Sequence, residues 1–381
     1  MLRKRIALVL ALPLAASGCA FFEREEEEDL DFAEYAEQLT DVRNESARLT
    51  GELDAAETRI VQECLEAQGF TVHESNEFIS WGSEQRDTFL DEAPYAWFLP
   101  TVEEAELRGV WQWTNLDGAE TIEDGVPWAA YQADEGANEH LVMSFDEDTE
   151  IPEFYRLDPQ EQFDWWVAYV GEDQARYRQG DLIGIEPEVD EDGNQEGGQP
   201  PAEGCRGEMV AAVYADVAEA RDEDFADWDY RPAMPFGDGE AMDQGYADRT
   251  ADAEGDLIDC IEERGPVGWE FFRGHLRIHD YLYESGEGSN PRLSFEDGGG
   301  AWPDPADDVP DADDTQGWLD FERDLAVVFA ECGDETGFRE TAEHAWQQVQ
   351  LRYYLETEGA VYAWQEEMRD LLAAAQAVLG G

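Results

Sequence analysis

Lysine is almost absent from this chain, and positive charge of any kind is scarce. Lys4 is its single lysine, and 24 Lys and Arg residues stand against 93 Asp and Glu residues, for a formal net charge of −69 at pH 7. A nucleic-acid-binding surface needs clustered cations to neutralise phosphates. The composition therefore argues against nucleic acid as a partner and leaves cations, basic proteins or neutral sugars. A general role of the acidity in solvation is the simpler interpretation.

Long apolar runs are also missing. The run Ile6–Ala16 has eleven residues, whereas a membrane-spanning helix needs about 20. This run follows Arg3, Lys4 and Arg5 and precedes Ser17-Gly-Cys19. A short apolar segment after a basic start is typical of a cleaved export signal, and small residues before a cysteine resemble the bacterial lipobox. We therefore predict a signal peptide over residues 1–18.

Cys19 is the residue that such a signal would lipidate. Ala16 departs from the lipobox, which usually has Leu or another branched residue there. The alternative is an ordinary secretory signal cut nearby, with Cys19 incidental. Because each buried lipid CH₂ contributes about 0.8 kcal/mol, a multi-acyl anchor would be permanent. The predicted location is the outer face of a bacterial cell membrane, with residues 19–44 as an acidic, solvated tether.

Closely spaced cysteine pairs of the Cys-x-x-Cys type do not occur, which argues against zinc-ribbon and thioredoxin-like sites. Beyond Cys19, four cysteines remain: Cys64, Cys205, Cys260 and Cys332. In an exported protein an even number predicts two disulfides, with three possible connectivities. We favour Cys64–Cys205 and Cys260–Cys332, because each bridge then stays within one half of the chain.

Hydrophobic and aromatic residues are plentiful, at 42% and 12% of the chain, so a sizeable core can form. Helical spacing of apolar residues or helix-capping residues predict helices over 49–64, 158–170, 208–221, a segment ending at 263, and 319–330. Alternation or aromatic content predicts short strands at 70–73, within 76–157, at 269–272 and at 276–279. The expected fold is α+β, mainly helical, with long irregular acidic loops.

The C-terminal region has the clearest helical pattern. Apolar side chains from Ala342 to Tyr353 and from Val361 to Val378 are spaced by alternating steps of three and four residues, which predicts a helical hairpin or one long helix around Gly359. Packing against the rest of the molecule is preferred over a seam for a partner, because each stretch is short for a coiled coil.

The expected domains are two halves joined by a loop. The N-terminal half, 45–221, contains Cys64 and Cys205, and the C-terminal half, 246–381, contains Cys260, Cys332 and the heptad-patterned helices. The loop, 222–245, is acidic and contains Pro and Gly.

The cysteines share a motif. Cys-x4-Gly occurs at Cys64, Cys260 and Cys332, and Gly204-Cys-Arg-Gly-Glu follows Asp190-Glu-Asp-Gly-Asn. These motifs resemble an uncharacterised, diffuse group of secreted proteins and lipoproteins of high-GC Gram-positive (actinobacterial) bacteria. The resemblance implies an exported, disulfide-bonded, largely helical protein, and it carries over no catalytic residues.

Metal-binding patterns are incomplete. His275-x3-His279-Asp280 has a spacing used for zinc, but no HExxH glutamate or third ligand accompanies it. The segment 190–194 begins like a calcium loop, yet Gln195 and Pro201 stand where Gly and Glu are needed. The acidic loop 304–314 is interpreted as solvated. We therefore predict no metal site and no cofactor.

Catalytic motifs are likewise absent: the chain has no Gly-x-Ser-x-Gly elbow and no Ser-x-x-Lys. The favoured function is a non-catalytic binding or interaction module of the cell envelope, with a protein or a cell-wall glycan as partner. A glycan-acting hydrolase with paired carboxylates is the alternative, and a structural, salt-adapted surface protein is the third. No catalytic residue is named, because 93 acidic residues offer no means of choosing a pair.

Overall fold

The structure is a computed structural model. It describes residues 29–78, 85–116, 118–122, 125–131, 152–185, 200–215, 230–235, 239–285, 302–304, 309–311 and 314–380. Its α-helices are α1 (Phe32–Ala67), α2 (Val102–Arg108), α4 (Pro159–Val170), α5 (Glu172–Gln179), α6 (Gly204–Val213), α8 (Gly239–Arg264), α9 (Ile278–Ser285), α10 (Thr315–Glu335) and α11 (Phe338–Gly380). Short 3₁₀ helices cover Ser75–Phe78, Pro94–Trp97, Gln112–Asn115, Ala119–Thr121, Glu153–Arg156 and Gly180–Ile183.

The described residues contain no strand, so the α+β part of the expected fold is not supported, whereas its mainly helical part is confirmed. The nearest approach to a sheet is one isolated bridge between Phe272 and His275. Arg273 and Gly274, which have positive φ, reverse the chain between Phe272 and His275. Helix α9 begins three residues after His275, at Ile278. The described aromatic segments within 76–157 instead form α2 and 3₁₀ helices.

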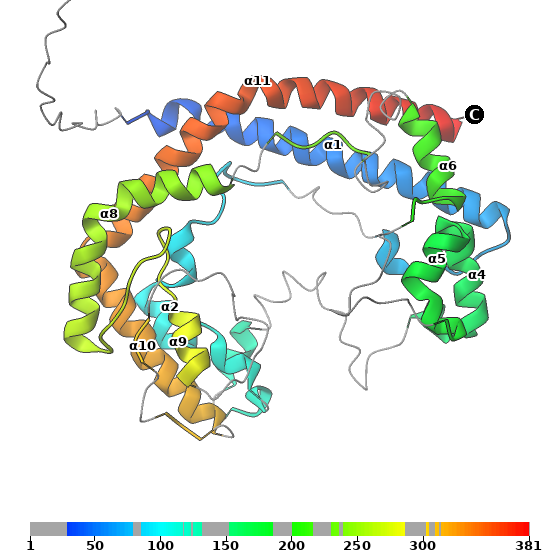
Figure 1. The fold of residues 1–381 in the computed structure, drawn as a ribbon. Helices are drawn as coiled ribbons and strands as arrows, with labels where there is room; N and C mark the ends of the chain where they lie inside the picture. Colours follow the sequence, from blue (N-terminus) through cyan, green and yellow to red (C-terminus); the bar gives the residue numbers. More distant parts are fainter. Residues whose placement is uncertain are drawn as a thin grey trace, which may run out of the picture.

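Two long helices, α1 and α11, run side by side in the same direction (Figure 1). The backbone N–H of Leu30 donates to Gln348 Oε1 at 2.8 Å. Further along both helices, Gln365 Nε2 donates to the carbonyl of Val42 at 3.0 Å. Successive residues of α1 thus meet successive residues of α11, as parallel packing requires.

Helix α1 begins earlier than the sequence pattern indicated. Residues 32–44, expected to be part of the acidic tether, form its first turns. The Asp31 side chain caps the helix by accepting from the N–H of Ala33, and Leu39 and Val42 are buried. Burial of these two side chains, which lie among acidic neighbours, packs this segment against the rest of the molecule. The signal peptide, Cys19 and residues 20–28 lie outside the described residues.

The two largest hydrophobic cores are built from helices that gather at opposite ends of the α1–α11 pair (Figure 1). One contains residues of α2, α8, α9, α10 and the first half of α11. The other contains residues of α1, α4, α6 and the second half of α11. The cores do not follow the expected halves, since Phe98 and Ala105 pack with α10 while Trp364 and Met368 pack with α1 and α4. Residues 239–245 of the expected loop belong to α8.

Helix α11 continues unbroken through Gly359, so the long-helix alternative describes the C-terminal region. Most of its patterned apolar residues are buried: Ala342, Trp346, Val349, Val361, Trp364, Met368, Leu371 and Ala375. They belong to the two cores or face α1, so the seam is used within the molecule.

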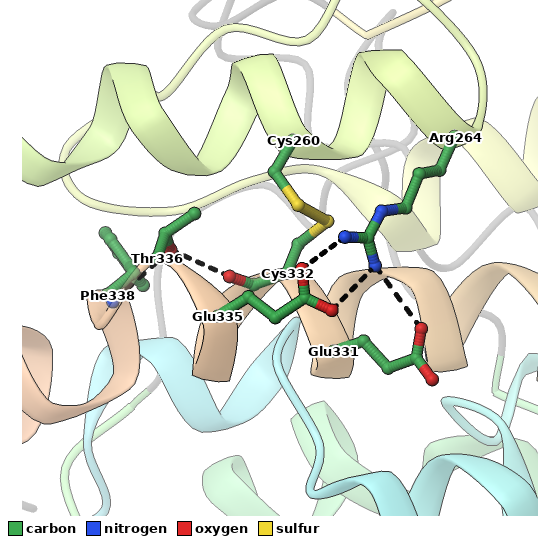
Figure 2. The surroundings of a disulfide bond; sticks show 7 residues. All are labelled: Cys260, Arg264, Glu331, Cys332, Glu335, Thr336 and Phe338. Atoms are coloured by element: carbon green, nitrogen blue, oxygen red, sulfur yellow. Dashed lines mark hydrogen bonds and ion pairs between the residues drawn. A yellow bond between two sulfur atoms is a disulfide. The ribbon is translucent and has the colours of Figure 1, made fainter.

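The four cysteines lie in the two pairs that the sequence analysis favoured. Cys64 of α1 is bonded to Cys205 of α6 with an S–S distance of 2.00 Å, and Cys260 of α8 to Cys332 of α10 at 2.12 Å. Figure 2 shows Arg264 beside the second bridge, where its guanidinium reaches Glu335 and Glu331 across the two helices. Disulfides indicate an oxidising, extracytoplasmic environment. In the part of the chain that the structure describes, no helix has the length and apolar character to span a membrane.

A buried carboxylate holds the loop after α2 against α10. Glu322 accepts the backbone N–H groups of Val110 at 2.6 Å, Gln112 at 3.0 Å and Trp113 at 2.9 Å. Gly109 has φ +61°, and a Cβ there would lie 2.8 Å from Glu322 Oε1, so only glycine fits. Burial raises the pKa of Glu322 to about 7, although the three N–H donors and Arg108 act in the opposite direction.

We expect Glu322 to make stability depend on pH. Between 4.5, its ordinary pKa, and about 7, the folded state keeps a proton that the unfolded state releases, so this contribution is lost as pH rises. Relative to Glu322→Gln, the wild-type unfolding free energy should fall by about 3 kcal/mol over this interval. Urea titrations from about pH 5 to 8 measure it.

The matched control is Glu331→Gln, an exposed position on the same helix. The difference in unfolding free energy between Glu331→Gln and the wild type should be the same at every pH in this range. A wild-type profile parallel to that of Glu322→Gln would contradict the raised pKa.

Candidate ligand-binding site

A partly open pocket of about 430 Å³ lies in the core that contains the Cys64–Cys205 bridge. Its walls come from α1, the 3₁₀ helix Ser75–Phe78, α4, α6 and the segment 230–231. Its lining is mainly polar and includes Asp54, Glu57, Asn76, Glu77, Phe78, Tyr169, Arg206, Met209, Tyr230 and Arg231. Several of these charged groups lie largely inside the molecule, which is costly without partners.

Close backbone contacts fix the start of α6 against α4. Gly204 has φ +57°, and a Cβ on it would lie 2.4 Å from the carbonyl oxygen of Ala168. The preceding residue, Glu203, donates its N–H to the carbonyl of Val170 at 2.8 Å. Cys205 adds the covalent bond to Cys64. The next residue, Arg206, is therefore held in place by three constraints on its immediate neighbours.

Glu57 is the most buried carboxylate of the pocket, with 5% of its surface exposed. Arg231 Nη2 lies 2.6 Å from Glu57 Oε2 and also pairs with Asp54, one turn earlier on α1. The hydroxyl of Tyr214 donates to Glu57 Oε1. Burial raises the pKa of Glu57, while Arg231 and Tyr214 partly oppose that effect by stabilising its ionised form. One guanidinium thus serves two carboxylates.

Glu77, which also lines the pocket, forms a separate ion pair. Arg178 of α5 reaches Glu77 Oε1 at 2.6 Å, and its guanidinium lies 4.5 Å from the ring centre of Trp166. The amide of Asn76 donates to the hydroxyl of Tyr155 at 3.1 Å. The carboxylate of Glu77 is therefore already engaged where it meets the pocket.

Arg206 differs from the other charged groups of the pocket. Its side chain is half-buried and lies beside the hydroxyl of Tyr230, yet among the described residues no carboxylate is within 4.0 Å of it. Burial raises the pKa of both Tyr169 and Tyr230, and the hydroxyl of Tyr169 is hydrogen-bonded to Glu77. In a chain so rich in acid, a cation without a carboxylate at ion-pair distance among the described residues is unexpected, and Glu77 raises the pKa of Arg206 only from farther away.

The histidines do not form the zinc pair considered from the sequence. His275 precedes α9, which begins at Ile278, so His275 and His279 do not share a helix face. Both ring nitrogens of His279 are engaged, Nδ1 with Gln112 and Nε2 with the carbonyl of Trp97, each at 2.8 Å. Asp280 lies 3.7 Å from Arg277. Within the described ranges, no group of three or more potential ligands gathers.

The remaining candidate positions fall largely outside the described residues. These are Cys19, the calcium-like segment 190–194 and much of the acidic loop 304–314. Asp314 is described, and its carboxylate caps α10 by accepting the N–H of Gly317 at 2.9 Å. That carboxylate therefore serves the helix end.

The tryptophans do not form the flat exposed row that would favour glycan binding. Trp97 is exposed at 64%, whereas the other described tryptophans are buried or half-buried. Trp111 and Trp113 contact each other with tilted rings near the loop held by Glu322. Core packing accounts for most of the described tryptophans.

A second hollow, of about 560 Å³, lies along the outer faces of α1 and α11. It is lined by Glu34, Glu37, Gln38, Asp41, Val42, Glu45, Tyr362, Gln365 and Arg369. Its one cation, Arg369, already pairs with Glu45 at 2.8 Å. This hollow is a solvated acidic surface and is the weaker candidate.

The sequence analysis missed Glu57, Arg206, Tyr230 and Arg231. One signal for Glu57 was available, because it lies four residues after Leu53 and four before Val61, both buried on α1. An acidic residue inside an apolar stripe indicates a buried partner. No comparable signal marks the other three, which come from segments far from Glu57 in the chain.

We expect the Glu57–Arg231 pair to be strongly coupled. Arg231→Gln leaves Glu57 buried without its cation and should lower the unfolding free energy by about 3 kcal/mol. Glu57→Gln combined with Arg231→Gln should cost less than the sum of the single changes. Urea denaturation of the three variants measures the coupling.

Arg59→Gln is the control, because Arg59 is an exposed arginine on α1 whose pair with Glu63 spans 3.8 Å. It should change the unfolding free energy by less than about 0.5 kcal/mol. Additive effects of Glu57→Gln and Arg231→Gln would show that the pair is not coupled.

Comparison with protein-family models, with curated proteins and with solved structures found no match in any of the three. The resemblance to actinobacterial secreted proteins therefore rests on the cysteine motifs alone.

Proposed function

We propose that this protein is a lipid-anchored, extracytoplasmic binding protein of the bacterial cell envelope, whose ligand occupies the pocket between α1, α4 and α6. One observation carries the proposal: Arg206 lines a mainly polar pocket of about 430 Å³ without an ion-pair partner among the described residues. Convergent polar groups in a pre-formed pocket are what orients a small molecule and selects it, and this pocket is more polar than most such sites. The disulfide and the close backbone contacts beside Arg206 support pre-organisation.

Binding suits the carboxylates of the pocket better than hydrolysis does. A glycosidase places two carboxyl groups on either side of the scissile bond, about 5–10 Å apart. Here Asp54 and Glu57 come from one face of α1 and both pair with Arg231. Glu77 pairs with Arg178. These groups are arranged to hold arginines in place.

The proposed anchor fits the position of the pocket along α1. Cys19 precedes the start of α1 at Phe32 by 13 residues. Asp54 and Glu57 follow that start by 22 and 25 residues, which is about 35 Å of helix at 1.5 Å per residue. The pocket therefore lies in the half of α1 that is farther from Cys19 along the chain.

We expect Cys19 to be the first residue of the mature protein and to carry lipid. Mass spectrometry of the N-terminal peptide from the bacterial membrane should show the added diacylglycerol mass on Cys19. Cys19→Ser should move the protein from the membrane fraction to the soluble fraction without changing its melting temperature. An unmodified Cys19, or a cut elsewhere, would refute the anchor and leave the pocket proposal standing.

We expect ligands to stabilise the protein through this pocket. In a thermal-shift panel of organic acids, amino acids, short peptides and cell-wall glycan fragments, at least one compound should raise the melting temperature by several degrees. Thr58→Trp, which adds bulk at the pocket wall, should abolish the shift.

Thr40→Trp is the matched control on the same helix, since Thr40 is half-buried like Thr58 and lies outside the pocket. It should keep the shift. A panel without any shift, or a shift that persists in Thr58→Trp, would overturn the proposed site.

A further inference from the structure

We infer that the pocket selects a small organic acid with a single carboxylate, which pairs with Arg206. This rests on the proposed function, because it names the ligand class of the same pocket. The inference comes from the ion pairs of the pocket. Arg231 is engaged by Asp54 and Glu57, and Arg178 by Glu77. Arg206 remains as the cation without an ion pair among the described residues that line the pocket.

A half-buried guanidinium is a strong determinant of ligand choice. Removing a charge from water is costly unless an opposite charge and hydrogen bonds compensate. The five N–H donors of arginine form a planar fork that matches the two oxygens of a carboxylate. Arg206 is held beside that space by the Cys64–Cys205 bond and by the contact of Gly204 with α4. The guanidinium of Arg206 is thus pre-organised to bind a carboxylate.

One neighbouring hydroxyl suits the same ligand. Tyr230 lines the pocket and its hydroxyl is hydrogen-bonded to the side chain of Arg206. A neutral phenol donates a hydrogen bond to an anion, and burial raises the pKa of Tyr230 further above its ordinary value. The hydroxyl of Tyr169 is already bonded to Glu77, so Arg206 and Tyr230 are the donors that meet a carboxylate.

The surrounding carboxylates limit the charge of the ligand to one. Asp54, Glu57 and Glu77 all line the pocket. Because Asp54 and Glu57 share the single guanidinium of Arg231, negative charge remains on that wall and opposes any ligand charge beyond the one that Arg206 compensates. The formal net charge of −69 adds a long-range repulsion that grows with the charge of the ligand. A monoanion matches the one open cation, whereas a phosphate monoester brings up to two negative charges to the same place.

The apolar part of the lining favours a ligand that carries an apolar group beside its carboxylate. Val61, Phe78 and Met209 line the pocket together with the ring of Tyr169. Aromatic and aliphatic walls favour a flat or branched apolar group beside the carboxylate. The volume of about 430 Å³ is at the small end of the range for ligand sites. An aromatic acid of one ring fits this description.

Benzoate is the probe for this inference. Three compounds of similar shape but different charge test whether the pocket prefers a single negative charge. Benzamide is neutral, phenyl phosphate brings up to two negative charges, and benzylamine carries one positive charge. Isothermal titration calorimetry on the full-length protein in a non-ionic detergent should rank benzoate as the tightest of the four. Arg206→Gln should weaken benzoate at least tenfold, while Arg206→Lys, which keeps the charge but loses the planar fork, should weaken it less.

Arg176→Gln is the matched control, because Arg176 is exposed on α5, pairs with Glu172 and does not line the pocket. It should leave benzoate affinity unchanged. Melting temperatures of all variants show whether each is folded. Tyr230→Phe provides a second test that keeps the charge of Arg206, and it should weaken benzoate severalfold.

The outcomes separate the two proposals. If benzamide or benzylamine binds more tightly than benzoate and Thr58→Trp abolishes that binding, the pocket binds ligands but the carboxylate inference is wrong. Tighter binding of phenyl phosphate, lost in Arg206→Gln, would show an anion site that is not limited to one charge. If none of the four probes binds, the carboxylate inference fails, and the broader thermal-shift panel decides whether the pocket binds any ligand.

Discussion

The parallel contact between α1 and α11 is the constraint on which the rest of the structure depends. Neither of the two cores is complete without α11, whose first half packs with α8 and α10 and whose second half packs with α1, α4 and α6. Polar side chains fix the register of the pair, among them Gln348 at Leu30 and Gln365 at Val42. Both glutamines are buried, so sliding one helix along the other would leave their amides without partners. The two ends of the molecule are therefore held together by one helix.

The shortage of cations shapes how this acidic protein is held together. Many of the described arginines connect segments far apart in the chain, as Arg43 does with Asp91 and Arg264 with Glu335. Arginine suits this use better than lysine, because its fork can bond several acceptors at once. Arg339 shows this by donating to the carbonyls of Leu99 and Pro100 as well as to Asp334. Against that background Arg206 stands out, because no carboxylate among the described residues lies at ion-pair distance from it.

Local signals in the sequence predicted helices well and failed where tertiary contacts decide. The helix after Asp158 is capped by that residue, has Pro159 in its first turn and ends at Gly171, as its local pattern indicates. Gly69 has positive φ directly after the end of α1, as expected for a helix stop. The segment 276–279 was interpreted as a strand because apolar residues alternate there, but four residues of alternation cannot exclude a helix start. The sequence does not show that residues 32–44 belong to α1, because Leu39 and Val42 are buried by residues far away in the chain.

The site was harder to predict than the fold for a related reason. Its charged residues come from α1, from the segment 75–78, from α6 and from residues 230–231, and no local period connects them. Only the disulfide pairing placed two of these segments together in advance, because Cys205 precedes Arg206 and Cys64 lies two turns beyond Glu57 on α1. A cysteine pair joining distant segments can therefore indicate where a site forms before any of its functional residues is recognised.

The same bridge links the site to the compartment in which the protein works. Reduction of Cys64–Cys205 would release the start of α6, leaving the Gly204 contact with α4 and the Glu203 hydrogen bond to hold Arg206. Because the bond closes a separation of 141 residues, its loss also frees a long segment of the unfolded chain, with a cost of several kcal/mol in the entropic model. A reducing environment would thus weaken both the core and the placement of Arg206. All three contacts that hold the start of α6 are present only once the disulfide has formed.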